Sequence, residues 1–197
     1  MAEIGRRLVH ASGSVVPAAY AVGLLQWDHV TALIGLGLGV AFGLEYARLR
    51  RGFDWWIYQK LTREYEQEQV AGYALYMVGL AVVAFTFEPW IAIPAMFMLT
   101  IGDPVGGILG RSGGSGAKRP TVLAFVFATC FVLALPFAWE GTVPGPPAAI
   151  VAGTGALVAA LADGVPLIVR GRYIDDNLTI PIGAATAMWL TALLVGV

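Results

Sequence analysis

The chain has 197 residues, of which 58% are hydrophobic and only 13% charged, and its mean hydropathy is +0.74. About a quarter of the residues in a soluble domain carry a charge, so this composition excludes a soluble enzyme and a disordered tail. The net charge of −1 supplies no basic face for nucleic acid, and the single cysteine, Cys130, excludes a disulfide framework and a cysteine-based zinc site.

The remaining class is an all-α polytopic membrane protein, because a spanning helix needs about 20 mostly apolar residues and this chain contains several such stretches. We predict one domain over 1–197, without internal repeats. The first apolar stretch follows Arg6 and Arg7 and also fits a cleavable signal peptide. In chain order the predicted spans, about seven in all, are 8–27, 30–47, 70–88, 90–109, 121–139, 148–169 and 179–197.

The 12 Lys and Arg residues lie before the first predicted span or in alternate loops. These loops join spans two and three, four and five, and six and seven. The other three loops carry Asp28, Glu88 and Glu140 but no basic residue. Because cytoplasmic loops are enriched in Lys and Arg, we predict a cytoplasmic N-terminus and an outside C-terminus.

The longest predicted cytoplasmic loop is 48–69. It places Trp55, Trp56, Tyr58 and Leu61 next to basic residues. This composition is typical of an amphipathic helix lying at the membrane interface. Such a helix either guides a lipid substrate or simply anchors the chain at the interface.

Acidic side chains lie inside the predicted spans or at their cytoplasmic ends, all toward one membrane face. An ionised Asp at the centre of a lone spanning helix costs about 2.5–3.5 kcal/mol, and such residues usually serve a function. Mg²⁺ prefers hard oxygen ligands and usually bridges substrate phosphates. The residues at this face are Glu45, Asp103, Asp163, Asp175 and Asp176. We predict that Asp103, Asp175 and Asp176 bind the metal and that Asp163 is a further ligand or a base.

A glycine-rich segment follows Asp103 and becomes basic toward its end. Backbone N–H groups in such a loop can hold phosphate oxygens, and basic side chains neutralise them. Gly106 and Gly110 share a helix face and permit close approach. The alternative is a small-residue packing helix followed by a flexible basic loop. The predicted nucleotide-binding residues are Gly106, Gly110, Arg111, Gly113, Gly114, Lys118, Arg119 and Asn177.

Structural roles compete with function at three further places. Helix capping by Asp176 or Asn177 explains one residue of the Asp-Asp-Asn stretch, but not the whole acidic set. His10 lies one turn after Arg6. Glu45 and Arg48 are three residues apart and are predicted to pair on one helix face. We keep His10, Glu45 and Arg48 as additional site candidates.

Taken in order, these elements resemble the polyprenol and lipid kinases, such as dolichol kinase and phytol kinase, which are related to the CTP-using phosphatidate cytidylyltransferases. Gly106 stands where that family usually has alanine, and Asp163 stands roughly where it tends to carry glutamate. The segment 121–124 lacks the family's Glu and Gly. The matching elements are Arg6-Arg7-x-x-His10, Glu45-x-x-Arg48, Arg63-Glu64-x-Glu66, Gly102-Asp103-x-x-Gly106-x-x-x-Gly110-Arg111 and Asp175-Asp176-Asn177-Leu178-x-Ile180-Pro181.

The resemblance implies a transmembrane catalytic domain that phosphorylates a membrane isoprenoid alcohol of the dolichol or polyprenol type at the cytoplasmic face. It implies CTP as the co-substrate and Mg²⁺ as the cofactor, with membrane lipids as further partners and no nucleic acid. One alternative is a cytidylyltransferase that makes a CDP-activated lipid. Another is a transporter of an anionic substrate. A transport path would need polar residues across the whole bilayer, but the predicted spans have few of them in their outer halves. The predicted catalytic residues are Asp103, Asp163, Asp175 and Asp176.

Overall fold

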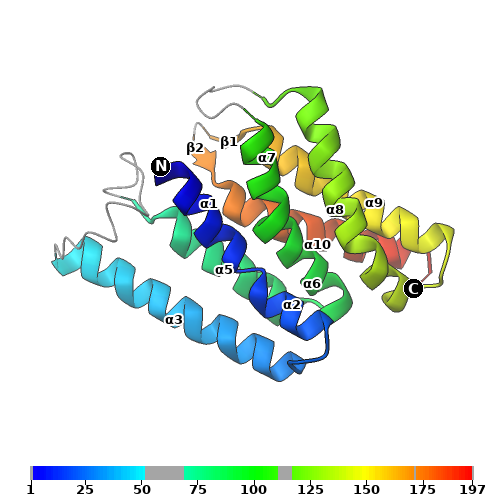
Figure 1. Cartoon of the computed structure of the whole chain (residues 1–197), viewed down its shortest axis with the longest axis horizontal. Coiled ribbons are helices and arrows are strands. Elements are labelled where there is room, and N and C mark those ends of the chain that lie inside the picture. Colours follow the sequence, from blue (N-terminus) through cyan, green and yellow to red (C-terminus); the bar gives the residue numbers. More distant parts are fainter. Residues whose placement is uncertain (1, 52–68, 111–116, 171, 197) are drawn as a thin grey trace.

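The computed structural model describes residues 2–51, 69–110, 117–170 and 172–196. These residues are mostly helical, and the helices pack side by side as a bundle (Figure 1). In chain order the elements are α1 (Ala2–Ser12), α2 (Val15–Ala21), α3 (Trp27–Arg51), α5 (Gly72–Thr86), α6 (Pro89–Phe97), the π-helical turn η2 (Met98–Gly102), α7 (Asp103–Leu109), α8 (Pro120–Gly141), α9 (Pro146–Gly164), β1 (Leu167–Val169), β2 (Arg172–Ile174) and α10 (Asp176–Leu194).

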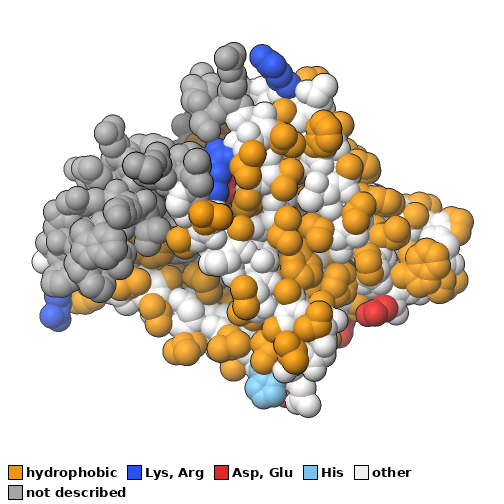
Figure 2. Space-filling view, viewed as in Figure 1, with side chains coloured by type: hydrophobic (Ala, Val, Ile, Leu, Met, Phe, Trp, Pro, Cys, Tyr) orange, Lys and Arg blue, Asp and Glu red, His pale blue; other side chains and the backbone are white. Residues whose placement is uncertain are grey.

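Within the described residues, five helical segments are long and apolar enough to cross a membrane. They are α3, α8, α9, α10 and the continuous helix Pro89–Leu109, which is built from α6, η2 and α7. The predicted span 70–88 is represented by α5, which has 15 residues. Many large apolar side chains face outward, and hydrophobic side chains are spread over the coloured part of the face seen in Figure 2. These features are those of an all-α membrane protein; the count of seven spans stays a prediction.

The prediction of one continuous helix over 8–27 is wrong. The chain forms two short helices, α1 and α2, separated at Gly13 and Ser14. The hydroxyls of Ser12 and Ser14 donate to the carbonyls of Val9 and Ala11, and such bonds compete with regular helix geometry. At Gly13 a methyl group would overlap the hydroxyl of Tyr76, so the chain approaches α5 closely at the break.

The predicted span 148–169 is also too long, because α9 ends at Gly164. Pro166 follows, and the residue before a proline is driven out of helical geometry. Val165 accordingly has φ −123° and ψ 115°. The next residues form the antiparallel hairpin β1–β2, with Arg170 at a φ of 50° in its turn. This hairpin, which the all-α prediction did not include, carries the chain directly into α10.

The centre of the bundle is the helix Pro89–Leu109, in which Ile91 to Phe97 are all buried. Its neighbours α9 and α10 present small residues, so the backbones pack closely. At Gly155, for example, a methyl group would meet the side chain of Met188. Figure 1 places the N-terminus, the hairpin and the beginning of α8 at one end of the bundle. The ends of α9 and α10 that flank the hairpin lie there too.

Candidate metal and phosphate site

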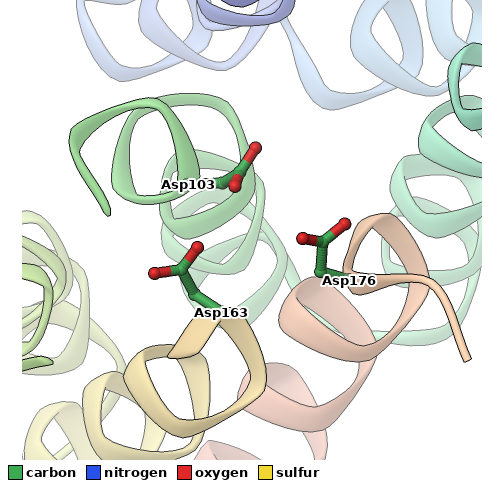
Figure 3. Close-up of side chains that lie close together, drawn as sticks. All are labelled: Asp103, Asp163 and Asp176. Atoms are coloured by element: carbon green, nitrogen blue, oxygen red, sulfur yellow. The ribbon is translucent and has the colours of Figure 1, made fainter. Parts of the chain in front are cut away.

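Three carboxylates from three helices converge at this end of the bundle. Asp103, Asp163 and Asp176 each offer an oxygen, and these oxygens lie within 4.8 Å of one another. Asp103 begins α7, Asp163 lies in the last turn of α9, and Asp176 begins α10. Figure 3 shows the three side chains directed toward a common space. The geometry therefore brings together acidic residues that are far apart in the chain.

Asp103 owes its position to a local change of helix type. The residues before it form the π-helical turn η2, and its N–H donates to the carbonyl of Met98, five residues back. Pro104 follows directly and lacks an N–H. Single π turns inside α-helices occur frequently at functional sites. The wider turn sets the direction of the Asp103 side chain within an otherwise buried helix.

Asp163 is the most buried of the three carboxylates, with a relative exposure of 7%. Its Oδ1 accepts a hydrogen bond from Nζ of Lys118 at 2.6 Å. Its Oδ2 is buried and has no hydrogen-bond partner among the described residues. Leaving such an oxygen unpaired costs free energy. A cation among the three carboxylates would pair with it, and an all-oxygen set suits Mg²⁺.

Two predicted nucleotide-binding glycines lie beside the ion pair between Asp163 and Lys118. At Gly106 a methyl group would overlap Oδ2 of Asp163, and it would lie 3.0 Å from Val126. At Gly110 it would meet the carbonyl of Gly106, with the Lys118 stem 3.5 Å away. Gly106 is therefore needed for packing against the acidic cluster and Gly110 for packing against its own helix, which is the packing role that the sequence left open as the alternative.

Replacing Gly106 by alanine is expected to lower both stability and metal affinity. The new methyl overpacks a buried site, which costs about 1–3 kcal/mol, and it pushes the Asp163 carboxylate away from its partners. The apparent unfolding temperature in detergent and Mn²⁺ binding, measured by paramagnetic resonance, check this. Gly43→Ala is the matched control, because nothing lies within 4 Å of its added methyl. Wild-type Mn²⁺ affinity in Gly106→Ala would contradict the packing argument.

Asp175, predicted as a metal ligand, caps α10 instead of joining the three converging carboxylates. Its Oδ1 accepts from the backbone N–H of Asn177 at 3.0 Å and from the Asn177 amide at 2.6 Å. Capping was foreseen for this stretch, but at Asp176 or Asn177. The place in the cluster that was assigned to Asp175 is filled by Asp163. The Asn177 Oδ1 is buried and has no hydrogen-bond partner among the described residues.

Only some of the predicted phosphate-binding residues lie in the part of the chain that the structure describes. Lys118 lies in the site, held by its side chain to Asp163 and by its N–H to the carbonyl of Gly164 at 2.8 Å. Arg119 is exposed at the N-cap of α8. Arg111, Gly113 and Gly114 lie outside the described residues, as does most of the predicted interfacial helix over 48–69.

Helix α1 contributes two residues to the site's edge. Nε2 of His10 lies 3.4 Å from Oδ2 of Asp103. Arg7 lies against α7, because a methyl group at Gly107 would overlap its guanidinium. In the sequence, Arg7 is a signal of topology and part of a motif, and it was not among the predicted site residues. Its i, i+3 spacing from His10 in an apolar chain was the available indication that both face the same neighbour.

The predicted pairing of Glu45 with Arg48 is confirmed. Nε and Nη2 of Arg48 donate to the two carboxylate oxygens at 3.0 and 2.8 Å. Glu45 also accepts from the N–H of Ala71 at 3.3 Å and from the hydroxyl of Tyr73. This network joins the end of α3 to the beginning of α5. It does not belong to the group of three converging carboxylates.

No family model, curated protein or solved structure matches the chain. Its fold and site are those of a helical membrane protein with one buried carboxylate, two partly buried carboxylates and a lysine gathered at one end of the bundle.

Proposed function

We propose that the chain is a membrane kinase that transfers the terminal phosphoryl group of CTP to an isoprenoid alcohol, of the dolichol or polyprenol type. The observation that carries the proposal is the convergence of Asp103, Asp163 and Asp176, with an unpaired buried oxygen on Asp163. The motif resemblance supplies the choice of CTP and of the acceptor. The charge pattern of the loops favours a site on the cytoplasmic side.

The residues present suit phosphoryl transfer, which depends mostly on positioning and charge neutralisation. Asp103, Asp163 and Asp176 would hold Mg²⁺, which neutralises phosphate charge when it is bound. Lys118 and Arg7 provide positive charge beside them. The acceptor hydroxyl oxygen forms a bond to the γ-phosphorus, and the bond to the β–γ bridging oxygen breaks. The hydroxyl proton passes to a base, for which a carboxylate of the cluster is the candidate.

The location of the site suits the two substrates. The nucleotide is soluble and anionic, whereas the alcohol is held in the bilayer with its hydroxyl at the surface. The cluster lies at the end of an apolar bundle, so a ligand from water and a ligand from lipid can meet there. The related cytidylyl transfer would use the same groups but attack the α-phosphorus.

The testing experiment incubates purified protein in nanodiscs with γ-labelled or α-labelled CTP, Mg²⁺ and a panel of isoprenoid alcohols, isoprenoid phosphates and diacylglycerol. ATP and UTP are run in parallel. The proposal expects label to reach an isoprenoid alcohol from the γ position only. Label reaching lipid only from the α position would establish the cytidylyltransferase instead. Absence of transfer from every nucleotide to every acceptor would reject both.

Replacing Lys118 by methionine is expected to change metal and nucleotide binding in opposite directions. Lys118 neutralises Asp163, so its removal frees that carboxylate and should raise Mn²⁺ affinity by about tenfold in the absence of nucleotide. The KM for the nucleotide should rise, since a phosphate partner is lost. Mn²⁺ titration and initial rates measure the two effects. Arg119→Met, next to it and exposed, is the control for Mn²⁺ binding. A lower Mn²⁺ affinity in Lys118→Met would contradict this competition.

A further inference from the structure

The π turn before Asp103 deprives one main-chain carbonyl of its donors. In a regular α-helix the carbonyl of Leu99 would accept from the N–H of Asp103. Here that N–H donates to Met98. In a continued π pattern the donor would be residue 104, which is proline and has no N–H. Since Leu99 is fully buried, its carbonyl needs a hydrogen bond from another part of the chain.

His10 supplies this hydrogen bond from a different helix. Its Nε2 lies 3.1 Å from the Leu99 carbonyl oxygen. A carbonyl oxygen can only accept, so Nε2 carries a hydrogen. The same nitrogen lies 3.4 Å from Oδ2 of Asp103. One ring nitrogen therefore contacts both the disrupted turn and the carboxylate that follows it.

The imidazole of His10 is held in place by α5. The hydroxyl of Tyr76 donates to the main-chain carbonyl of His10 at 3.1 Å. The Tyr76 ring meets the imidazole edge to face, with 4.4 Å between the ring centroids. The interruption between α1 and α2 at Gly13 gives the Tyr76 hydroxyl the space that it needs. The position of the ring is thus defined by contacts on two sides.

We propose that His10 is a positioning residue that locks the π turn and thereby aims Asp103 at the other two carboxylates. Groups that orient metal ligands from outside the ligand set typically affect metal affinity or activity by about 10- to 100-fold. The inference rests on the metal site of the proposed function, but it needs neither CTP nor a lipid acceptor. It also gives α1 a function other than crossing the bilayer.

The test compares His10→Ala, His10→Gln, Pro104→Ala and the double variant His10→Ala/Pro104→Ala in the purified full-length protein. Mn²⁺ affinity and the apparent unfolding temperature are measured for each. We expect His10→Ala to lose about 10- to 100-fold in Mn²⁺ affinity and at least about 2–4 °C in unfolding temperature. His10→Gln should lose less, because its amide can donate to the Leu99 carbonyl.

Pro104→Ala separates stabilisation of the helix from aiming of the carboxylate. It restores an N–H that can reach the Leu99 carbonyl, so the thermal loss from His10→Ala should shrink in the double variant while Mn²⁺ affinity stays low. Wild-type Mn²⁺ affinity in His10→Ala would overturn the inference. So would recovery of both properties in the double variant, because His10 would then only satisfy a carbonyl. If the wild type binds Mn²⁺ but phosphorylates no lipid, the proposed function fails, and the His10 variants still decide this inference. If the wild type binds no Mn²⁺, both fail.

Discussion

Replacing Asp163 by asparagine is expected to reduce phosphoryl transfer by more than about a hundredfold, a larger loss than changes outside a ligand set typically cause. Asp163 is the most buried of the three carboxylates, and its Oδ2 is buried without a hydrogen-bond partner among the described residues. The amide keeps the shape but removes the charge that would balance a cation. Initial rates with labelled CTP and Mn²⁺ titration of the same preparation measure the two consequences. Asp103→Asn and Asp176→Asn should behave alike.

Asp175→Asn provides a control within the same stretch of sequence. Asp175 caps α10, and asparagine caps helices about as well as aspartate. We therefore expect stability and Mn²⁺ affinity close to those of the wild type, whereas Asp176→Asn, one residue along, loses metal binding. Asp28→Asn, exposed at the beginning of α3, serves as a distant control. Equal losses in Asp175→Asn and Asp176→Asn would contradict the assignment of the cluster.

The contrast between Asp175 and Asp176 marks the limit of what adjacency in sequence can predict. Both residues were assigned to the metal because they are acidic and precede a predicted span. At a helix beginning, one residue serves as the cap and the next is already in the first turn, so their side chains point in different directions. Which of the two residues caps the helix depends on where β2 ends and α10 begins. The hairpin begins just after Pro166, and its first strand lies in the apolar run that was predicted as the end of span 148–169.

The helical membrane fold was largely predictable, because long apolar segments can satisfy their backbone groups in lipid only as helices. Local departures from regular helix geometry could not be predicted in this way. Apolar periodicity carries no signal for the π turn Met98–Gly102, which adds a residue to one turn without changing composition. The contact between His10 and Leu99 depends on that turn and joins positions 89 residues apart. Pro104 was the one local sign that the helix would be irregular there.

Replacing Glu45 by alanine is expected to give the largest loss of stability, about 3–5 kcal/mol. Glu45 is 4% exposed and accepts hydrogen bonds from Arg48, Ala71 and Tyr73. Its removal leaves the partly buried Arg48 guanidinium without its carboxylate and takes away an acceptor from two further groups. The apparent unfolding temperature in detergent and the yield of folded protein measure the loss. Because Arg48 also donates to the carbonyl of Gln69 at 2.6 Å, the connection between α3 and α5 should loosen as well.

Glu45→Ala removes both the charge and the side-chain methylenes of Glu45, and a double variant separates these two contributions to the loss of stability. Glu45→Gln/Arg48→Met removes both charges, and replacing a buried pair with groups of similar volume is often nearly neutral. We expect this double variant to be more stable than Glu45→Gln alone, which keeps the positive charge of Arg48 but removes the negative charge that balances it. Its Mn²⁺ affinity should equal that of the wild type, because Glu45 lies outside the three-carboxylate group. If Mn²⁺ binding fell together with stability, the Glu45 network and the carboxylate cluster would be one coupled unit.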